Sequence, residues 1–187
     1  MKLHQTMLVA VFMLIASTSA HAGKMTKSKE ALVVAPDKAT IVFMRPGKFV
    51  GAAIAVPVFD VTAPETTFVG LVEAGSKVAY SVPAGEHVFM TTVFGGAAGV
   101  RFYKANVEAG KTYYFRAHII ENLWGLEPVR STMGEELAGW DKATTLTVNS
   151  PKTMAWAEEN KASVAEKRVL KPPAIVDANT LRPEDGR

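Results

Sequence analysis

Between residues 39 and about 148, apolar and polar side chains alternate in short runs, and glycine or proline interrupts the runs. In residues 76–82 (SKVAYSV), for example, Val78, Tyr80 and Val82 alternate with small or polar residues. A period of two places neighbouring side chains on opposite faces of an extended strand. The predicted strands span residues 39–45, 53–59, 67–73, 76–82, 86–94, 100–107, 111–120, 123–130 and, less clearly marked, 144–148.

Short strands at this spacing are typical of all-β sandwiches and barrels. We expect residues 39–148 to form a mainly antiparallel β-sandwich, immunoglobulin-like or transthyretin-like, with about seven to nine strands. Turns are expected at Ala74-Gly75, Pro83-Ala84-Gly85 and Ala109-Gly110, where glycine is free to adopt positive φ. Pro57 lies inside a run, which indicates an edge or bulge position.

The pattern changes after Asn149. Ser150 is a favoured N-cap residue and Pro151 a favoured first helical residue, so the sequence predicts a C-terminal helix over residues 149–170. Prolines end this helix, and residues 171–187 are expected to be a disordered tail.

The predicted helix has a thin apolar stripe. Its members are Met154, Ala157 and Val164, with Glu158, Glu159 and Lys161 expected on the opposite side. Such a helix is expected to pack weakly or to lie exposed.

Residues 1–22 have the pattern of an export signal. A short basic start precedes an apolar run from Met7 to Ala16, and Ala20-His21-Ala22 is an A-x-A cleavage pattern. The run is shorter than the roughly 20 residues that a membrane span needs. We expect cleavage after Ala22 and a periplasmic or secreted protein without a transmembrane span, in which residues 23–38 are a flexible lead-in. The alternatives are an uncleaved anchor and a buried core helix.

Composition narrows the class further. The chain of 187 residues contains no cysteine, so no disulfide can stabilise it and the lipoprotein signal is missing. Its formal net charge is +3 and no run of lysine or arginine stands out, which gives no support for binding nucleic acid or an anionic membrane.

Gly110-Lys111-Thr112 matches the end of a phosphate-binding P-loop. The full motif also needs a glycine five residues earlier, where this chain has Ala105, and a helix must follow. Residues 112–120 instead alternate as a strand. We therefore interpret the tripeptide as a hairpin turn.

Three stretches resemble landmarks of one bacterial family: ATIVFMRPGKFVG (39–51), SVPAGEHVF (81–89) and VEAGKTYYFRA (107–117). They are similar to domain of unknown function 2846, a family of small exported proteins and lipoproteins. The resemblance covers roughly residues 39–130 and implies an all-β domain in the cell envelope, with no established activity or catalytic residues. The absent lipoprotein cysteine departs from many members of that family.

The loop of residues 45–51 (RPGKFVG) is the best local candidate for a binding site. Two cations and two glycines could form a nest for a carboxylate or phosphate. The predicted ligand-binding residues are Arg45, Lys48 and Phe49. The alternative is an ordinary loop in which the arginine pairs with an acid and Phe49 covers the core.

No catalytic, metal or cofactor site is predicted. Beyond the signal the chain holds only His87 and His118 as histidines, fewer ligands than a zinc site needs, and it lacks G-x-S-x-G. Its paired carboxylates are expected to be solvated. Four aromatic residues could line a sugar or peptide surface, although core packing is the simpler reading: Tyr103, Tyr114, Trp124 and Trp140.

The sequence thus predicts a non-catalytic binding or structural module of the bacterial cell envelope. Its partner would be a protein, peptide or glycan, contacted through loops at one end of the sandwich and through the C-terminal helix. The alternatives are a hydrolase acting on an envelope polymer and an assembly subunit that pairs through a sheet edge.

Overall fold

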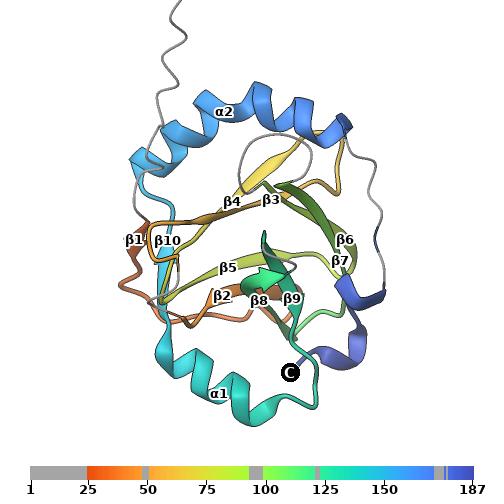
Figure 1. Ribbon diagram of the computed structural model, residues 1–187. Coiled ribbons are helices and arrows are strands. Elements are labelled where there is room, and N and C mark those ends of the chain that lie inside the picture. The colour runs from red at the N-terminus through yellow and green to blue at the C-terminus, as the bar shows by residue number, and fades with distance from the viewer. Residues whose placement is uncertain (1–24, 48–50, 93–98, 121–122, 171–174, 176) are drawn as a thin grey trace, which may run out of the picture.

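The computed structural model describes residues 25–47, 51–92, 99–120, 123–170, 175 and 177–187. Two β-sheets face each other across the core, and one helix lies over the outer face of each sheet (Figure 1). The layers are therefore helix, sheet, sheet and helix. The predicted signal peptide lies outside the described residues.

One sheet has six strands, which follow the order β1 (Thr26–Lys27), β10 (Thr145–Val148), β5 (Ser76–Val82), β2 (Ala39–Arg45), β8 (Thr112–Ile120) and β9 (Leu123–Pro128). The other has five, in the order β11 (Thr180–Leu181), β7 (Val100–Val107), β6 (Gly85–Thr92), β3 (Val56–Asp60) and β4 (Thr67–Val72). Helix α1 (Gly134–Ala143) lies on the six-stranded sheet and helix α2 (Pro151–Leu170) on the five-stranded sheet (Figure 1).

The β-sandwich prediction is confirmed in its class, and it is wrong in strand number and pairing. The described residues form eleven strands, and three of the pairs are parallel: β2 with β8, β10 with β5, and β11 with β7. Each parallel pair joins segments far apart in the chain, so no hairpin turn fixes its direction.

Aromatic side chains join the two sheets at the centre of the core. Phe43 on β2 stacks on Phe115 of β8, with ring centroids 5.6 Å apart, and meets Phe89 of β6 edge-on at 5.1 Å. Tyr103 on β7 meets Phe115 at 5.9 Å. These rings are fully buried, as the alternating pattern of their strands predicts.

The outer faces of the sheets are also buried, which a two-layer sandwich would not require. Val42 and Met44, on the face of β2 away from the central core, are fully buried in a cluster that includes Leu137 of α1. Phe59 and Met90 of the five-stranded sheet pack in a third cluster with Val164 of α2. The extra helix α1 is a feature that the sequence analysis missed.

Side chains satisfy backbone groups on two of the four edge strands, β4 and β9. The outermost strand β4 has its Val69 carbonyl 3.1 Å from the side-chain amide of Asn149, which donates to it. On the outermost strand β9, the Leu126 N–H donates to the Tyr103 hydroxyl at 2.9 Å. These groups are thus already used at the places where another strand would pair.

The C-terminal segment is ordered, against the prediction of a disordered tail. Described residues 177–187 form a 3-10 turn η2 (Asp177–Asn179), strand β11 and a second turn η3 (Pro183–Asp185). Leu181 is fully buried in the central core, and the backbone of Arg187 exchanges two hydrogen bonds with Thr112, of 2.7 and 3.0 Å.

A buried carboxylate secures this segment. Asp185 is 2 % exposed and accepts hydrogen bonds from Arg130 Nη1 at 2.9 Å, from Ser131 N at 3.1 Å and from Arg182 N at 3.0 Å. Arg130 also donates to the Thr180 carbonyl at 2.7 Å. A carboxylate with three donors is well compensated for its burial.

The lead-in of residues 23–38 also departs from the prediction. Its described part contributes strand β1, which pairs antiparallel with β10, and Met25 packs in the central core. Both segments that the sequence predicted to be flexible or disordered, before residue 39 and after residue 170, therefore contribute an edge strand to a sheet.

Candidate functional site

Helix α2 begins as the sequence predicts. The Ser150 hydroxyl accepts the Thr153 N–H at 3.1 Å, and the Thr153 hydroxyl accepts the Ser150 N–H at 2.7 Å. This reciprocal arrangement is a capping box with threonine at the third helical position, and it satisfies donors that every helix start leaves open. It fixes where α2 leaves β10 and therefore how the helix crosses the sheet.

The sheet-facing side of α2 shares only Val164 with the predicted stripe and also contains Thr153 and Trp156. Thr153 and Val164 are buried, and the Trp156 ring lies 5.8 Å from that of Phe68 on β4. Phe68 in turn lies 5.5 Å from Phe59 on β3. Met154 remains 49 % exposed, so it does not hold the helix to the sheet.

At the other end of α2, Arg168 forms hydrogen bonds with the loop between β3 and β4. Its guanidinium donates to the carbonyls of Val61, Ala63 and Pro64 at 2.9, 2.8 and 2.7 Å, and to the Thr66 hydroxyl at 3.1 Å. The planar fork of arginine suits several acceptors at once. The helix is thus held at both ends and by a narrow apolar strip between them.

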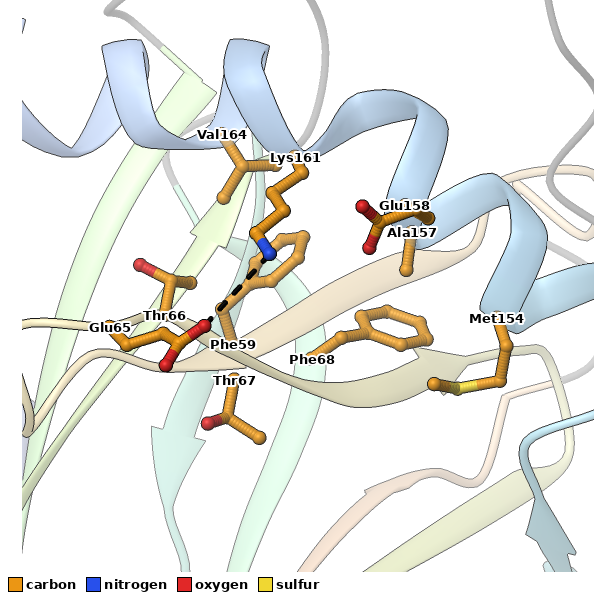
Figure 2. Close-up of a pocket in the computed structure, with 10 residues that line it drawn as sticks. All are labelled: Phe59, Glu65, Thr66, Thr67, Phe68, Met154, Ala157, Glu158, Lys161 and Val164. Atoms are coloured by element: carbon orange, nitrogen blue, oxygen red, sulfur yellow. Dashed lines mark ion pairs between the residues drawn. The ribbon is translucent and has the colours of Figure 1, made fainter.

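A groove remains between α2 and β4, because the helix touches the sheet along only one side. It has a volume of about 250 Å³ and a floor made by Phe59 and Phe68 (Figure 2). Met154 and Ala157 form its helical wall. A second hollow of about 440 Å³ continues along the helix past Ala165 to Val169, which is 76 % exposed.

Charged groups border the groove. Lys161 reaches from α2 across the opening toward Glu65, with 3.9 Å between Nζ and Oε1 (Figure 2). Glu158 lies on the helical wall near Ala157, so Glu158 and Lys161 share the side of Met154 rather than the opposite side expected from the sequence. Apolar surface with a charged rim is characteristic of surfaces that bind other molecules.

The structure gives Arg45 a role inside the protein. The side chain is 1 % exposed, its Nη2 donates to the Gly51 carbonyl at 2.7 Å and its Nη1 donates to the Ile54 carbonyl. The guanidinium carbon lies 3.9 Å from the ring centroid of Trp124, and burial lowers the pKa of Arg45. Gly51 has φ 62°, and a Cβ there would lie 2.8 Å from the Trp124 ring.

Arg45 therefore holds the end of the 45–51 loop in place, a variant of the ordinary-loop alternative with carbonyls in place of an acid. Lys48 and Phe49 lie outside the described residues. The ligand-binding prediction for these three residues stays a prediction.

The two histidines lie in different places. His87 Nε2 donates to the Pro83 carbonyl at 2.9 Å, and the ring is almost fully buried. His118 is partly exposed on the six-stranded sheet, with Nε2 3.3 Å from Glu127 Oε2, a carboxylate oxygen that Arg116 Nη2 also contacts at 2.5 Å. Burial and then Arg116 lower the pKa of His118, while Glu127 acts in the opposite direction.

All four aromatic residues singled out pack against neighbours within the fold. Tyr103 is fully buried, Trp124 is 7 % exposed beneath Arg45, and the ring of Trp140 lies 4.5 Å from the guanidinium carbon of Arg116. Tyr114 packs with the α1 cluster and is half-buried. The simpler reading, core packing, accounts for most of this aromatic surface.

Sequence reasoning missed the groove because its two walls lie about ninety residues apart in the chain. A signal was present in Trp156 and Val164, eight residues apart on one helical face, which marks the sheet-facing side. Among the described residues, no group of three or more histidine, cysteine, aspartate or glutamate side chains is placed to hold a metal ion. No helix in the same part of the chain has the length and apolarity to cross a membrane.

No family model matches the chain, and no curated protein matches it at a significant level of similarity.

Proposed function

We propose that this chain is a non-catalytic binding module of the bacterial cell envelope that engages a protein partner through the groove between α2 and β4. The observation that carries the proposal is the apolar floor of Phe59 and Phe68 beneath a helix whose flank is exposed at Met154. Covering such surface removes apolar area from water, at about 25 cal/mol per Å².

The means by which α2 is held supports a binding role. The Ser150 cap, the Arg168 clamp and the Trp156 contact keep the helix in place from its ends and its inner side. The side of the helix above β4, which includes Met154 and Glu158, makes none of these three contacts. A wall that is rigid before binding reduces the entropy that a partner must lose on docking.

Pairing through a sheet edge is less well supported as an alternative. Asn149 already satisfies the Val69 carbonyl on β4, and Tyr103 already accepts the Leu126 N–H on β9. A strand that pairs with β4 would have to displace Asn149, and one that pairs with β9 would have to displace Tyr103. The hydrolase alternative gains no specific support from the surroundings of His87 or His118.

Export to the envelope is part of the proposal and rests on the pattern of residues 1–22. Fractionation of cells that express the full chain with a C-terminal tag would test it. The expected result is a periplasmic or secreted protein whose N-terminal sequencing starts at Gly23. Retention in the cytoplasm with the first methionine present would refute this part.

A photo-crosslinking residue at position 157 tests the binding surface in cells. Ala157 lines the groove, whereas Ala155 is exposed two residues away and does not line it, so the same residue at position 155 is the matched control. We expect one discrete protein adduct from position 157 and none from position 155. Equal adducts from both positions, or none from either, would refute the proposed binding surface.

A further inference from the structure

The exposed flank of α2 carries residues with a particular order. The four that share this side of the helix, three or four positions apart, are Met154, Glu158, Lys161 and Ala165. All are exposed, and they extend over roughly 16 Å of helix at 1.5 Å per residue. Counted from either end, this set of four begins with an apolar residue, and a charged residue follows.

Read in the opposite direction, the same four residues place a positive charge opposite each negative charge. If a second α2 lies antiparallel alongside the first, with a two-fold axis between residues 159 and 160, Glu158 faces Lys161 of the second copy. The same axis places the long Met154 side chain opposite the small Ala165. Both pairings occur twice, as the symmetry of a two-fold interface requires.

A parallel arrangement would have the opposite electrostatics. Identical residues would then face each other, so Glu158 would meet Glu158 and Lys161 would meet Lys161. Like charges brought together at an interface are strongly unfavourable. The charges of the flank therefore select the antiparallel arrangement.

The fold leaves Lys161 able to take part. Its only ion pair among the described residues is with Glu65, at 3.9 Å, and the side chains are 60 % and 83 % exposed. An exposed pair at this distance contributes little to stability, so exchanging it for a contact with another chain has a small cost. Meanwhile Met154 and Val169 lose exposed apolar surface when a second helix covers the flank.

We infer that the protein partner of the α2 groove is a second copy of this chain, and that two copies associate antiparallel through the α2 flanks. This inference rests on the proposed function, because it names the partner of the same groove. The result is a symmetric dimer in which the charge pair between Glu158 and Lys161 forms twice.

Charge reversal provides the test. Glu158→Lys and Lys161→Glu each create two like-charge contacts in the dimer, and the double variant restores two opposite-charge contacts. Sedimentation of the purified mature chain, up to the millimolar range, should show a dimer for the wild type. Each single variant should raise the dimer dissociation constant at least about tenfold, which corresponds to about 1.4 kcal/mol. The double variant should stay close to the wild type.

A mixture of the two single variants gives the sharpest result. The Glu158→Lys copy then offers two cations and the Lys161→Glu copy two anions, so the mixed dimer should form although neither variant pairs with itself. Glu159→Lys is the matched control, since it makes the same change at an exposed neighbour that does not line the groove. Circular dichroism of each variant checks that the fold is retained.

The outcomes separate this inference from the proposed function. A wild-type monomer at all concentrations, no association in the mixture, or equal weakening by Glu159→Lys would overturn the dimer. If position 157 then still forms an adduct with a different protein in cells, the groove binds that protein and the proposed function stands. Without any adduct, both fail.

Discussion

Asp185 offers a direct test of how the C-terminal segment is held. Replacement of Asp185 by alanine removes the acceptor of three hydrogen bonds, from Arg130, Ser131 and Arg182. Removing one partner of a buried ion pair typically costs about 3–5 kcal/mol. The Arg130 side chain is 31 % exposed, so water can solvate part of the guanidinium that is left behind, and we expect the lower end, about 3 kcal/mol.

The expected shift is readily measurable. For a domain of this size, each kcal/mol lowers the melting temperature by about 2–4 °C, so Asp185→Ala should melt about 6–12 °C below the wild type. Circular dichroism during thermal and urea unfolding measures the change. Chymotrypsin provides a local readout, because release of the segment should expose the bond after Leu181, whose side chain is fully buried in strand β11.

Glu184→Ala is the matched control, since Glu184 is the exposed neighbour on the same turn. We expect it to change the melting temperature by less than about 2 °C, as surface substitutions usually alter stability by about 0.5 kcal/mol or less. If Asp185→Ala melts together with Glu184→Ala and the wild type, the segment is not held by the buried carboxylate and the reasoning is refuted.

Two further predictions concern the six-stranded sheet. Tyr103→Phe leaves the Leu126 N–H of strand β9 without its acceptor and should lower the free energy of unfolding, measured in urea, by about 1–3 kcal/mol. Tyr114→Phe, at a half-buried tyrosine, is the comparison. An unchanged urea midpoint for Tyr103→Phe would contradict the role of this hydrogen bond. The lowered pKa of His118 means that the folded chain binds protons less readily at this site than the unfolded chain, whose histidine titrates near about 6.5. Stability should therefore fall as the pH drops below about 6.5, and His118→Gln should flatten that dependence; equal slopes for both proteins would refute it.

Local patterns predict most of the individual strands. Residues 39–45, 76–82 and 100–107 form β2, β5 and β7 within the expected bounds, because alternation of side chains is a property of a few consecutive residues. The expected turn at Gly110 is present, with φ 76°, which glycine adopts without strain. The turn leads from β7 into β8, and residues 112–120 form a strand, as their period predicts. The interpretation as a hairpin is wrong, because β7 and β8 lie in different sheets and do not pair.

Helix α1 shows where local patterns fail. Its sequence contains Gly134 and Gly139, both poor helix formers, and no side chain caps its start. The helix forms where Leu137 and Trp140 cover Val42 and Met44. Tertiary packing thus outweighs a weak local preference, and only acidic residues in the first turn and Lys142 in the last hinted at a helix.

Parts of the candidate site could also be predicted from local sequence, and other parts could not. Ser150 and Pro151 correctly predicted the start of α2, because capping involves only residues within one helical turn. The groove could not be foreseen, because its floor comes from β3 and β4 and its wall from a helix that follows some ninety residues later. Arg45 likewise carried the right chemistry for an anion, and only the positions of Trp124, Gly51 and Ile54 show that it is used inside the fold.

The sequence by itself determined most of the strands, several of the turns and the start of the last helix, since each depends on interactions among close neighbours in the chain. The tertiary structure decided which strands run parallel, that both outer sheet faces are covered, and that Leu181 and Asp185 bring the C-terminal segment into the core. These outcomes depend on contacts between distant segments, whose free energy is set by shape and burial that no local pattern encodes.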